Sequence, residues 1–303
     1  MNMKNILLAL CFVFVSASAQ KTEYVVVAVI DGARYTETFG HSTHEYIPFL
    51  WNRLSSMGTT YSNFYNNETT ETNSGHAIIT TGTWQHLKND GSERPHKPTV
   101  FEYYRKKTNT AADLCQVVLG KNKLDILSFS DDPAYGEPYR SMVQLASSKS
   151  DLEALENFYA VVKEKHPKII VMNLPEVDTK GHSGKWNDYV QAIRQADSIV
   201  YVMWNFIQQD SIYKDKTTLI ITNDHGRHSD GVATGFHDHG CDCQGCRHIM
   251  LSILGPDTPA GMIDSTTYQL IDIAPTIATL LKFTTAKAEG EVIRSAIPHV
   301  GNK

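Results

Sequence analysis

The chain has 303 residues, of which 41% are hydrophobic, and a formal net charge of −5. This length is enough for one large α/β domain, with or without a cap. The mild acidity and the lack of a basic cluster in the sequence argue against a nucleic-acid partner.

Residues 1–19 have the features of a signal peptide. Lys4 precedes an apolar run over residues 6–15, and the small residues that follow end at Ala19. The run is too short to span a bilayer, and no later stretch is long and apolar enough to do so. We therefore expect cleavage near Ala19 and an exported protein, periplasmic or secreted, with residues 20–303 as a single domain.

The first predicted strand covers residues 24–30, an unbroken β-branched run that is typical of burial on both sheet faces. A predicted helix then begins within residues 69–82, which read T-T-E-T-N-S-G-H-A-I-I-T-T-G. A hydroxyl at a helix N-terminus faces free backbone N–H groups and the dipole end that favours an anion. Thr72 is therefore a candidate nucleophile, and the alternative is that Thr72 or Ser74 only caps the helix.

Residues 84–148 are rich in polar and turn residues, which suggests a cap or insertion without a clear domain boundary. Ser150 and Glu153 form a predicted capping box that opens a helix ending at about residue 165. Residues 186–209 carry apolar side chains at helical spacing and predict a second long helix.

Two later apolar runs repeat the buried-strand pattern of the first. Residues 168–174 lead to Asp178, and residues 217–222 lead to Asp224, as the first strand leads to Asp31. In open α/β sheets the loops at the carboxyl ends of the strands form the ligand crevice. The sequence therefore indicates an α/β fold in which three aspartates could converge on one site.

Histidines accompany these aspartates. His182 follows Asp178 at four residues and His225 follows Asp224 directly; His237, His239 and His248 come next. Oxygen and nitrogen ligands of this kind suit zinc, and also manganese. A single Asp–His pair often caps a turn or lies on the surface, but several such groups at strand exits favour a metal site.

Together these motifs resemble the alkaline phosphatase superfamily of two-metal phosphoesterases, which includes the type I phosphodiesterases, nucleotide pyrophosphatases and phosphoglycerate mutases. The resemblance rests on V-I-D-G at Asp31, T-N-S-G-H-A-I-I-T-T-G at Thr72, D-T-K-G-H-S-G at Asp178 and T-N-D-H-G at Asp224. Residues 271–281 also resemble a helix near the end of these proteins, within a helical stretch over 268–281 that we expect to be interrupted near Pro275. The resemblance implies a single catalytic domain with a three-layer α/β/α fold, a mostly parallel central sheet and a small cap.

The resemblance also implies two divalent metal ions, zinc or alternatively manganese. One ion would bind Asp178, His182 and His239, with His237 as the alternative to His239. The other would bind the set Asp31, Asp224, His225 and the Thr72 oxygen.

The implied reaction is attack by Thr72 on a small-molecule phosphomonoester or phosphodiester. The resulting phospho-threonine would be hydrolysed with net retention at phosphorus. Candidates for binding the non-bridging phosphate oxygens are Asn89, Lys121 and Lys123, which could instead be ordinary solvated surface.

The same motifs leave other functions to consider. A nucleotide pyrophosphatase or phosphodiesterase proper is nearly as well supported as a phosphomonoesterase. A phosphomutase-like enzyme is chemically close, but its substrates would be cytoplasmic, and the predicted signal peptide argues against it. A sulfatase is disfavoured because the sequence around Thr72 is not C/S-x-P-x-R. From another class comes a non-catalytic metal- or phosphate-binding protein on the same fold.

The cysteines after the leader are Cys115, Cys241, Cys243 and Cys246. An even number in an exported protein favours disulfides that hold the loop after His239, while a further metal site or a redox pair is the alternative. We expect His76 to support the Thr72 turn and His228 to support a metal ligand.

Overall fold

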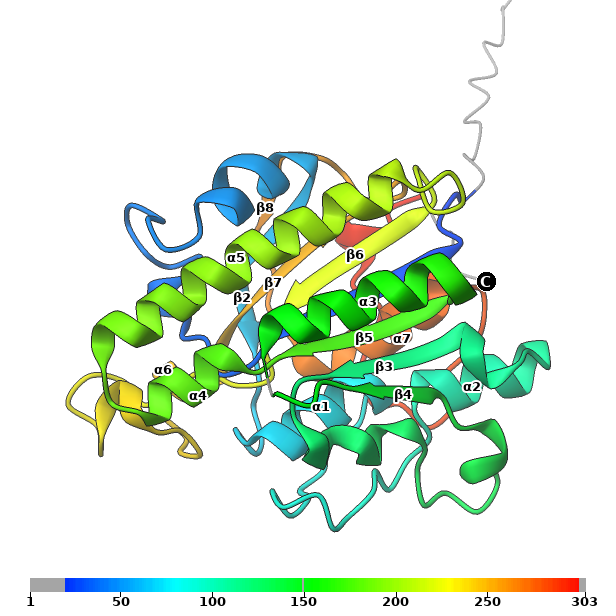
Figure 1. Ribbon diagram of the computed structural model, residues 1–303, viewed down its shortest axis with the longest axis horizontal. Coiled ribbons are helices and arrows are strands. Elements are labelled where there is room, and N and C mark those ends of the chain that lie inside the picture. Colours follow the sequence, from blue (N-terminus) through cyan, green and yellow to red (C-terminus); the bar gives the residue numbers. More distant parts are fainter. Residues whose placement is uncertain (1–19, 149, 300–303) are drawn as a thin grey trace, which may run out of the picture.

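The computed structural model describes residues 20–148 and 150–299. The predicted signal peptide lies outside these residues. In the described part of the chain a nine-stranded sheet has the order β4-β3-β5-β1-β6-β7-β2-β8, with β9 also paired to β2 (Figure 1). The strands are β1 (Tyr24–Ile30), β2 (Gly58–Tyr65), β3 (Cys115–Leu119), β4 (Met142–Leu145), β5 (Ile169–Leu174), β6 (Thr217–Thr222), β7 (His248–Leu254), β8 (Met262–Asp264) and β9 (Tyr268–Gln269).

The central strands are parallel, and β7 is the antiparallel member of the sheet. β1 pairs in parallel with both β5 and β6, whereas β7 runs antiparallel to β6 and to β2. The three predicted strands are therefore neighbours, and their carboxyl ends meet at one edge of the sheet.

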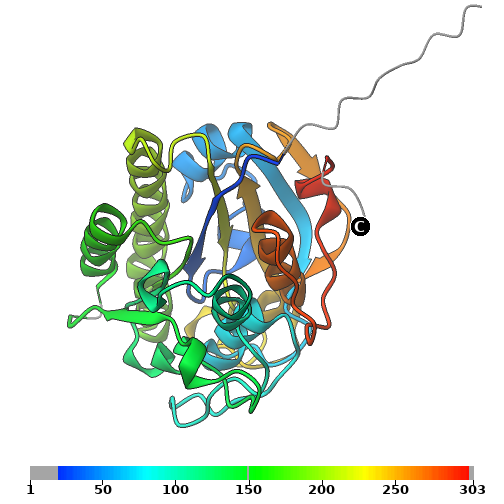
Figure 2. The same ribbon diagram turned by 90° about the vertical axis from the view of Figure 1, so that its right-hand side faces the viewer.

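Helices cover both faces of the sheet (Figures 1 and 2). On one face lie α3 (Asp151–Lys165) and α5 (Trp186–Gln209), and on the other lie α1 (Thr72–Thr81), α2 (Val100–Thr108) and α7 (Ile273–Leu280). Short helices are α4 (Glu176–His182) and α6 (Gln244–Arg247). A π turn covers Leu50–Leu54, and 3-10 turns cover Tyr35–Glu37, Ser55–Met57, Ala112–Leu114, Asn122–Ser128, Glu137–Tyr139, Gly235–His237, Leu270–Asp272 and Arg294–Ala296.

The β-branched composition of β1 follows from its position between two hydrophobic cores. Val25, Val27 and Val29 pack into the core shared with α1, α2 and α7. The alternate residues, Val26, Ala28 and Ile30, pack into the core shared with α3 and α5. The predicted three-layer α/β/α architecture with a mostly parallel central sheet is confirmed.

The predicted capping box at the start of α3 is wrong in one half. The Ser150 side chain accepts a hydrogen bond from the Leu152 amide, as a cap should. The Glu153 carboxylate, however, accepts hydrogen bonds from the amides of Ser147 and Ser148, both at 2.7 Å. The preceding turn therefore uses the carboxylate that a capping box would direct back to Ser150.

The predicted interruption near Pro275 is also wrong. Residues 268–272 form β9 and a 3-10 turn, and Pro275 is the third residue of α7. In the first turn of a helix the backbone N–H has no intrahelical acceptor, so proline does not break the helix there.

Residues 84–148 supply α2, β3 and β4, and the two strands extend the central sheet beyond β5. The division into domains stays a prediction. Among the described residues, no helix is both long and apolar enough to cross a membrane.

Candidate active site

The three aspartates lie at the carboxyl edge of the sheet. Asp31 follows β1, Asp224 follows β6, and Asp178 lies on α4 just after β5. The N-terminus of α1 reaches the same edge because Gly75 lets the helix approach the Asp224 loop. A Cβ at Gly75 would lie 2.7 Å from the Asp224 carbonyl oxygen.

Thr72 is the first residue of α1 and is buried. Its Oγ1 lies 3.4 Å from Nε2 of His225 and 3.5 Å from Nζ of Lys121. The N-cap is Glu71, without a side-chain cap bond, and the Ser74 hydroxyl bonds to the backbone of Leu87. The alternative reading of Thr72 or Ser74 as the helix cap is therefore wrong.

Asp31, Asp224 and His225 form one buried group. His225 Nε2 lies 3.7 Å from Asp31 Oδ1 and 3.4 Å from Asp224 Oδ2. The other oxygen of each carboxylate accepts a hydrogen bond, from the Asn173 amide to Asp31 and from the Gly32 N–H to Asp224. Asp31 Oδ1 receives no hydrogen bond from the described residues, whereas Asp224 Oδ2 lies 3.1 Å from Nδ1 of His76. Buried carboxylate oxygens without donors are costly, so this arrangement fits a cation.

Asp178, His182 and His239 form a second group beside the first. Asp178 Oδ1 lies 3.3 Å from His182 Nε2 and 3.6 Å from His239 Nε2. The spacing of four residues puts Asp178 and His182 on the same side of α4. His239 stacks on His225 with ring centroids 3.8 Å apart, which joins the two groups.

His239, and not His237, reaches this site. His237 is exposed, and its ring lies against Gly184, where a Cβ would come within 2.4 Å of it. The more distant His248 stacks on Tyr35 and Tyr65.

The imidazoles are oriented as metal ligands usually are. His225 donates its Nδ1–H to the Gly226 carbonyl at 2.8 Å, and His239 donates its Nδ1–H to the Thr70 carbonyl at 2.8 Å. Such a bond fixes the ring and leaves Nε2 free to bind a metal. Burial and the neighbouring His225 lower the pKa of His239 to about 2, so its imidazole stays neutral.

Lys121, Lys123 and Asn89 also lie at the site. Lys121 Nζ contacts Asp31 Oδ2 at 2.9 Å and Asp178 Oδ2 at 2.6 Å, while Lys123 donates to Asn89 Oδ1 at 2.7 Å. Asn89 Oδ1 in turn accepts the Asn73 amide of α1 at 3.1 Å. Only 14% of the Lys121 side chain is exposed, so it is not solvated surface.

The charged groups around the site shift the pKa values of its carboxylates and of Lys121. Burial opposes ionisation of Asp178, but the Lys121 ammonium and the contacts with His182, His225 and Arg227 outweigh it and hold the pKa well below the usual value. Burial together with the nearby Asp224 raises the pKa of Asp31. Burial also disfavours the charged form of Lys121, yet the surrounding carboxylates raise its pKa overall.

Sequence reasoning missed Arg227 and Asn173. The fully buried Arg227 donates from Nη1 to Asp178 Oδ1 at 2.5 Å and from Nη2 to the His237 carbonyl at 2.7 Å. Its place directly after D-H-G was the available signal. Asn173, on β5, contacts both Asp31 and His76, and nothing in its sequence surroundings marks it. His76, which was expected to support the Thr72 turn, donates to the Thr72 carbonyl at 2.9 Å.

A pocket of about 370 Å³ adjoins the two lysines, and its lining residues are Lys121, Asn122, Lys123, Pro175 and Thr179. It offers space for a small molecule next to the polar groups around Thr72.

Comparison with known proteins shows what this chain is similar to. A family model described as the metalloenzyme superfamily matches residues 137–285. That range includes five of the candidate ligands, namely Asp178, His182, Asp224, His225 and His239. A search of curated proteins by comparison gives no match.

Solved structures of three hydrolases show the same fold. Wild-type alkaline phosphatase PafA superposes with a TM-score of 0.71 at 12% identity, covering 91% of this chain and 99% of PafA. The phosphonate monoester hydrolase of Agrobacterium radiobacter gives 0.65 at 13% identity, with 93% and 78% covered. The PsFucS1 sulfatase from Pseudoalteromonas sp. gives 0.63 at 11% identity, with 93% and 72% covered.

The chain therefore has the fold of the alkaline phosphatase superfamily of metal-dependent hydrolases, and the resemblance drawn from its motifs is confirmed. The family match and the Asp–His groups support binding of divalent metal ions.

Proposed function

We propose that this chain is an exported two-metal phosphoester hydrolase in which Thr72 is the nucleophile. The observation that carries the proposal is the position of the Thr72 hydroxyl. It lies at the start of α1, 3.4 Å from His225 and 3.5 Å from Lys121, where the two Asp–His groups meet.

Two divalent ions, zinc or alternatively manganese, fit the donors present. Asp178, His182 and His239 would hold one ion, and Asp31, Asp224, His225 and the Thr72 oxygen would hold the other. When bound, the ions lower the pKa of the hydroxyl and neutralise charge on the phosphoryl group. The Asp31 Oδ1 atom without a donor, and the Nε2 atoms of His225 and His239 that face the aspartates, support this assignment.

The chain's own residues position and stabilise the transferred group. As the bond from Thr72 Oγ1 to phosphorus forms, the bond to the leaving oxygen breaks and the leaving group departs. The phosphoryl charge then lies at the N-terminus of α1, where the helix dipole favours an anion. Lys121, near Thr72, provides a cation on the same side, and water later cleaves the phospho-threonine.

The polar groups around Thr72 favour a monoester over a diester. Lys121, Lys123 and Asn89 concentrate donors and positive charge within one short segment of the site. A phosphomonoester dianion has more negative charge to pair with these groups than a diester monoanion. A nucleotide pyrophosphatase or phosphodiesterase, a phosphomutase-like enzyme and a non-catalytic metal- or phosphate-binding protein are the competing functions.

The test compares turnover of p-nitrophenyl phosphate and bis-p-nitrophenyl phosphate by the zinc-loaded protein. Thr72→Ala should abolish turnover and keep nearly all bound metal. Thr69→Ala is the matched control, because that hydroxyl contacts His86 outside the site. Turnover retained in Thr72→Ala would overturn the nucleophile, and an inactive wild type would favour the binding protein.

A further inference from the structure

The three cysteines after His239 gather around a histidine that the candidate active site does not use. Donor atoms of His228, Cys241, Cys243 and Cys246 all lie within 4.8 Å of one another. The closest pairs are His228 Nδ1 with Cys241 Sγ at 2.9 Å, His228 Nδ1 with Cys246 Sγ at 3.3 Å, and the Cys241 and Cys246 sulfurs at 3.6 Å. Each of these cysteines is a free thiol.

We propose that these four residues form a structural zinc site, separate from the two-metal centre. Zinc binds four ligands tetrahedrally, with Zn–S bonds of about 2.3 Å and Zn–N bonds of about 2.0–2.1 Å. Neighbouring ligand atoms in such a tetrahedron lie about 3.5–3.8 Å apart. The cluster already approaches this spacing, and three sulfurs with one nitrogen complete the coordination without an open position. A closed Cys₃His site is structural rather than catalytic.

The backbone around the cluster is arranged to support thiolates. The Ser229 amide donates to Cys243 Sγ and the Cys243 amide donates to Cys241 Sγ, both at 3.3 Å. Amide donors to sulfur stabilise the negative charge of a metal-bound thiolate. Two of the three sulfurs therefore already have the outer contacts that zinc–thiolate sites use.

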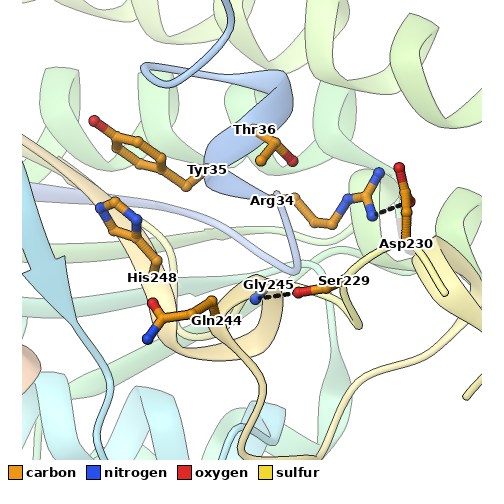
Figure 3. Close-up of a pocket in the computed structure, with 8 residues that line it drawn as sticks. All are labelled: Arg34, Tyr35, Thr36, Ser229, Asp230, Gln244, Gly245 and His248. Atoms are coloured by element: carbon orange, nitrogen blue, oxygen red, sulfur yellow. Dashed lines mark hydrogen bonds and ion pairs between the residues drawn. The ribbon is translucent and has the colours of Figure 1, made fainter. Parts of the chain in front are cut away.

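The segment that carries His228 lies directly against the segment that carries the cysteines. The Gly226 amide donates to the Cys246 carbonyl at 2.8 Å. The Gly245 amide donates to the Ser229 hydroxyl at 2.9 Å, as Figure 3 shows. A Cβ at Gly226 would lie only 1.9 Å from the Gly245 carbonyl oxygen, so glycine is required for this approach. The close backbone contact brings the four donors together.

A disulfide would account for fewer of these four residues than a zinc site does. A bond between any two of the three cysteines would leave the third unpaired, and Cys115 is buried in β3, outside the cluster. The histidine would also have no role. Zinc uses all three sulfurs and the imidazole.

The site would hold both arms of the loop that carries the candidate ligands. His228 comes three residues after His225, and Cys241 comes two residues after His239. The Cys241 carbonyl accepts the Thr70 hydroxyl at 3.1 Å, and the His239 ring donates to the Thr70 carbonyl. The zinc site therefore links the two histidine ligands to the segment that precedes Thr72.

Cobalt substitution of the full chain tests this inference. A thiolate bound to Co²⁺ gives an intense near-ultraviolet charge-transfer band, which oxygen and nitrogen ligands do not give. The wild type and Cys115→Ser should show the band, and Cys243→Ser and Cys246→Ser should lose it. Because the candidate active site contains no sulfur, an empty two-metal centre would leave the band in place, whereas a wild type without the band would overturn the zinc site.

Two measurements on the wild type do not depend on the variants folding. Protein purified after export should hold bound zinc that thiol-specific reagents release. Once unfolded with a chelator and without a reductant, the chain should show all four cysteines of the described part as thiols. Loss of a pair of thiols in that titration would show a disulfide and overturn the site.

Discussion

At the residue scale, Lys121 is the group whose contacts say most about the substrate. Its ammonium touches Asp31 and Asp178 and lies close to the Thr72 hydroxyl. With metal ions on the carboxylates, the same cation is placed to pair with a phosphate oxygen. The charge that Lys121 supplies should therefore matter more for a dianionic substrate.

Lys121→Gln should lower kcat/KM more for the monoester than for the diester. A hydrogen bond to a charged group contributes about 1.5–3 kcal/mol, so we expect a loss of about tenfold to a hundredfold on p-nitrophenyl phosphate. The control is Lys180→Gln, which removes an exposed lysine from α4. Equal losses on the two substrates would contradict a role in binding the second negative charge.

Single residues also show how far sequence reasoning reaches. Asp31, Asp178 and Asp224 were predictable because each follows an apolar strand, and parallel strands end at one edge. Asn173 was not, because its role depends on which segments meet across the fold, whereas Arg227 had the signal of its place after D-H-G. The cysteine count predicts disulfides, since spacing alone does not show that His228 joins the cysteines.

At the element scale, α5 is tied to the π turn over Leu50–Leu54 by one buried carboxylate. Asp197 accepts hydrogen bonds from the Phe49 amide at 3.0 Å and the Leu50 amide at 2.6 Å. Burial raises the pKa of Asp197 to about 6, even though these two amides favour its ionised form.

Asp197→Asn should therefore change how stability depends on pH. The native state keeps this proton to a higher pH than the unfolded chain, so the contribution to stability is lost as pH rises from 3.8 to about 6. Relative to the variant, the wild type should lose about 3 kcal/mol of unfolding free energy across this window. Denaturant unfolding at several pH values measures it, with the exposed Asp188→Asn on α5 as control. Parallel pH profiles for wild type and Asp197→Asn would refute the assignment.

The predictions about single elements that proved wrong failed for local reasons. Long periodic runs gave α3 and α5 correctly, because burial of one face decides them. The capping box failed because the turn before α3 uses the Glu153 carboxylate. The interruption at Pro275 failed because this proline lies in the first turn of α7, where it costs no helical hydrogen bond.

At the scale of the whole molecule, the strand order brings residues 31, 72, 178 and 224 to one place. The buried carboxylates of Asp31, Asp178 and Asp224 then lie together, and Lys121 contacts only Asp31 and Asp178, so bound cations would offset the remaining negative charge. A ligand that binds only the native state stabilises it by mass action.

Chelation should therefore lower the thermal stability of the protein. At metal concentrations about 100 to 1,000 times the Kd, binding contributes about 3–4 kcal/mol per site, which scanning calorimetry would register as a fall in Tm on adding EDTA. Asp31→Asn removes one charge of the centre and should show a smaller fall. Cys243→Ser removes a ligand of the proposed cysteine site and so tests that site separately. If EDTA no longer lowered the Tm of Cys243→Ser, the whole effect would come from the cysteine site, and the two-metal centre would lose its support.

The most direct measurement is anomalous X-ray scattering at the zinc edge from crystals of the zinc-loaded protein. We predict one peak among Asp178, His182 and His239 and a second beside Asp31, Asp224, His225 and the Thr72 oxygen. A map without both peaks at this edge of the sheet, or with Thr72 away from any metal, would contradict it.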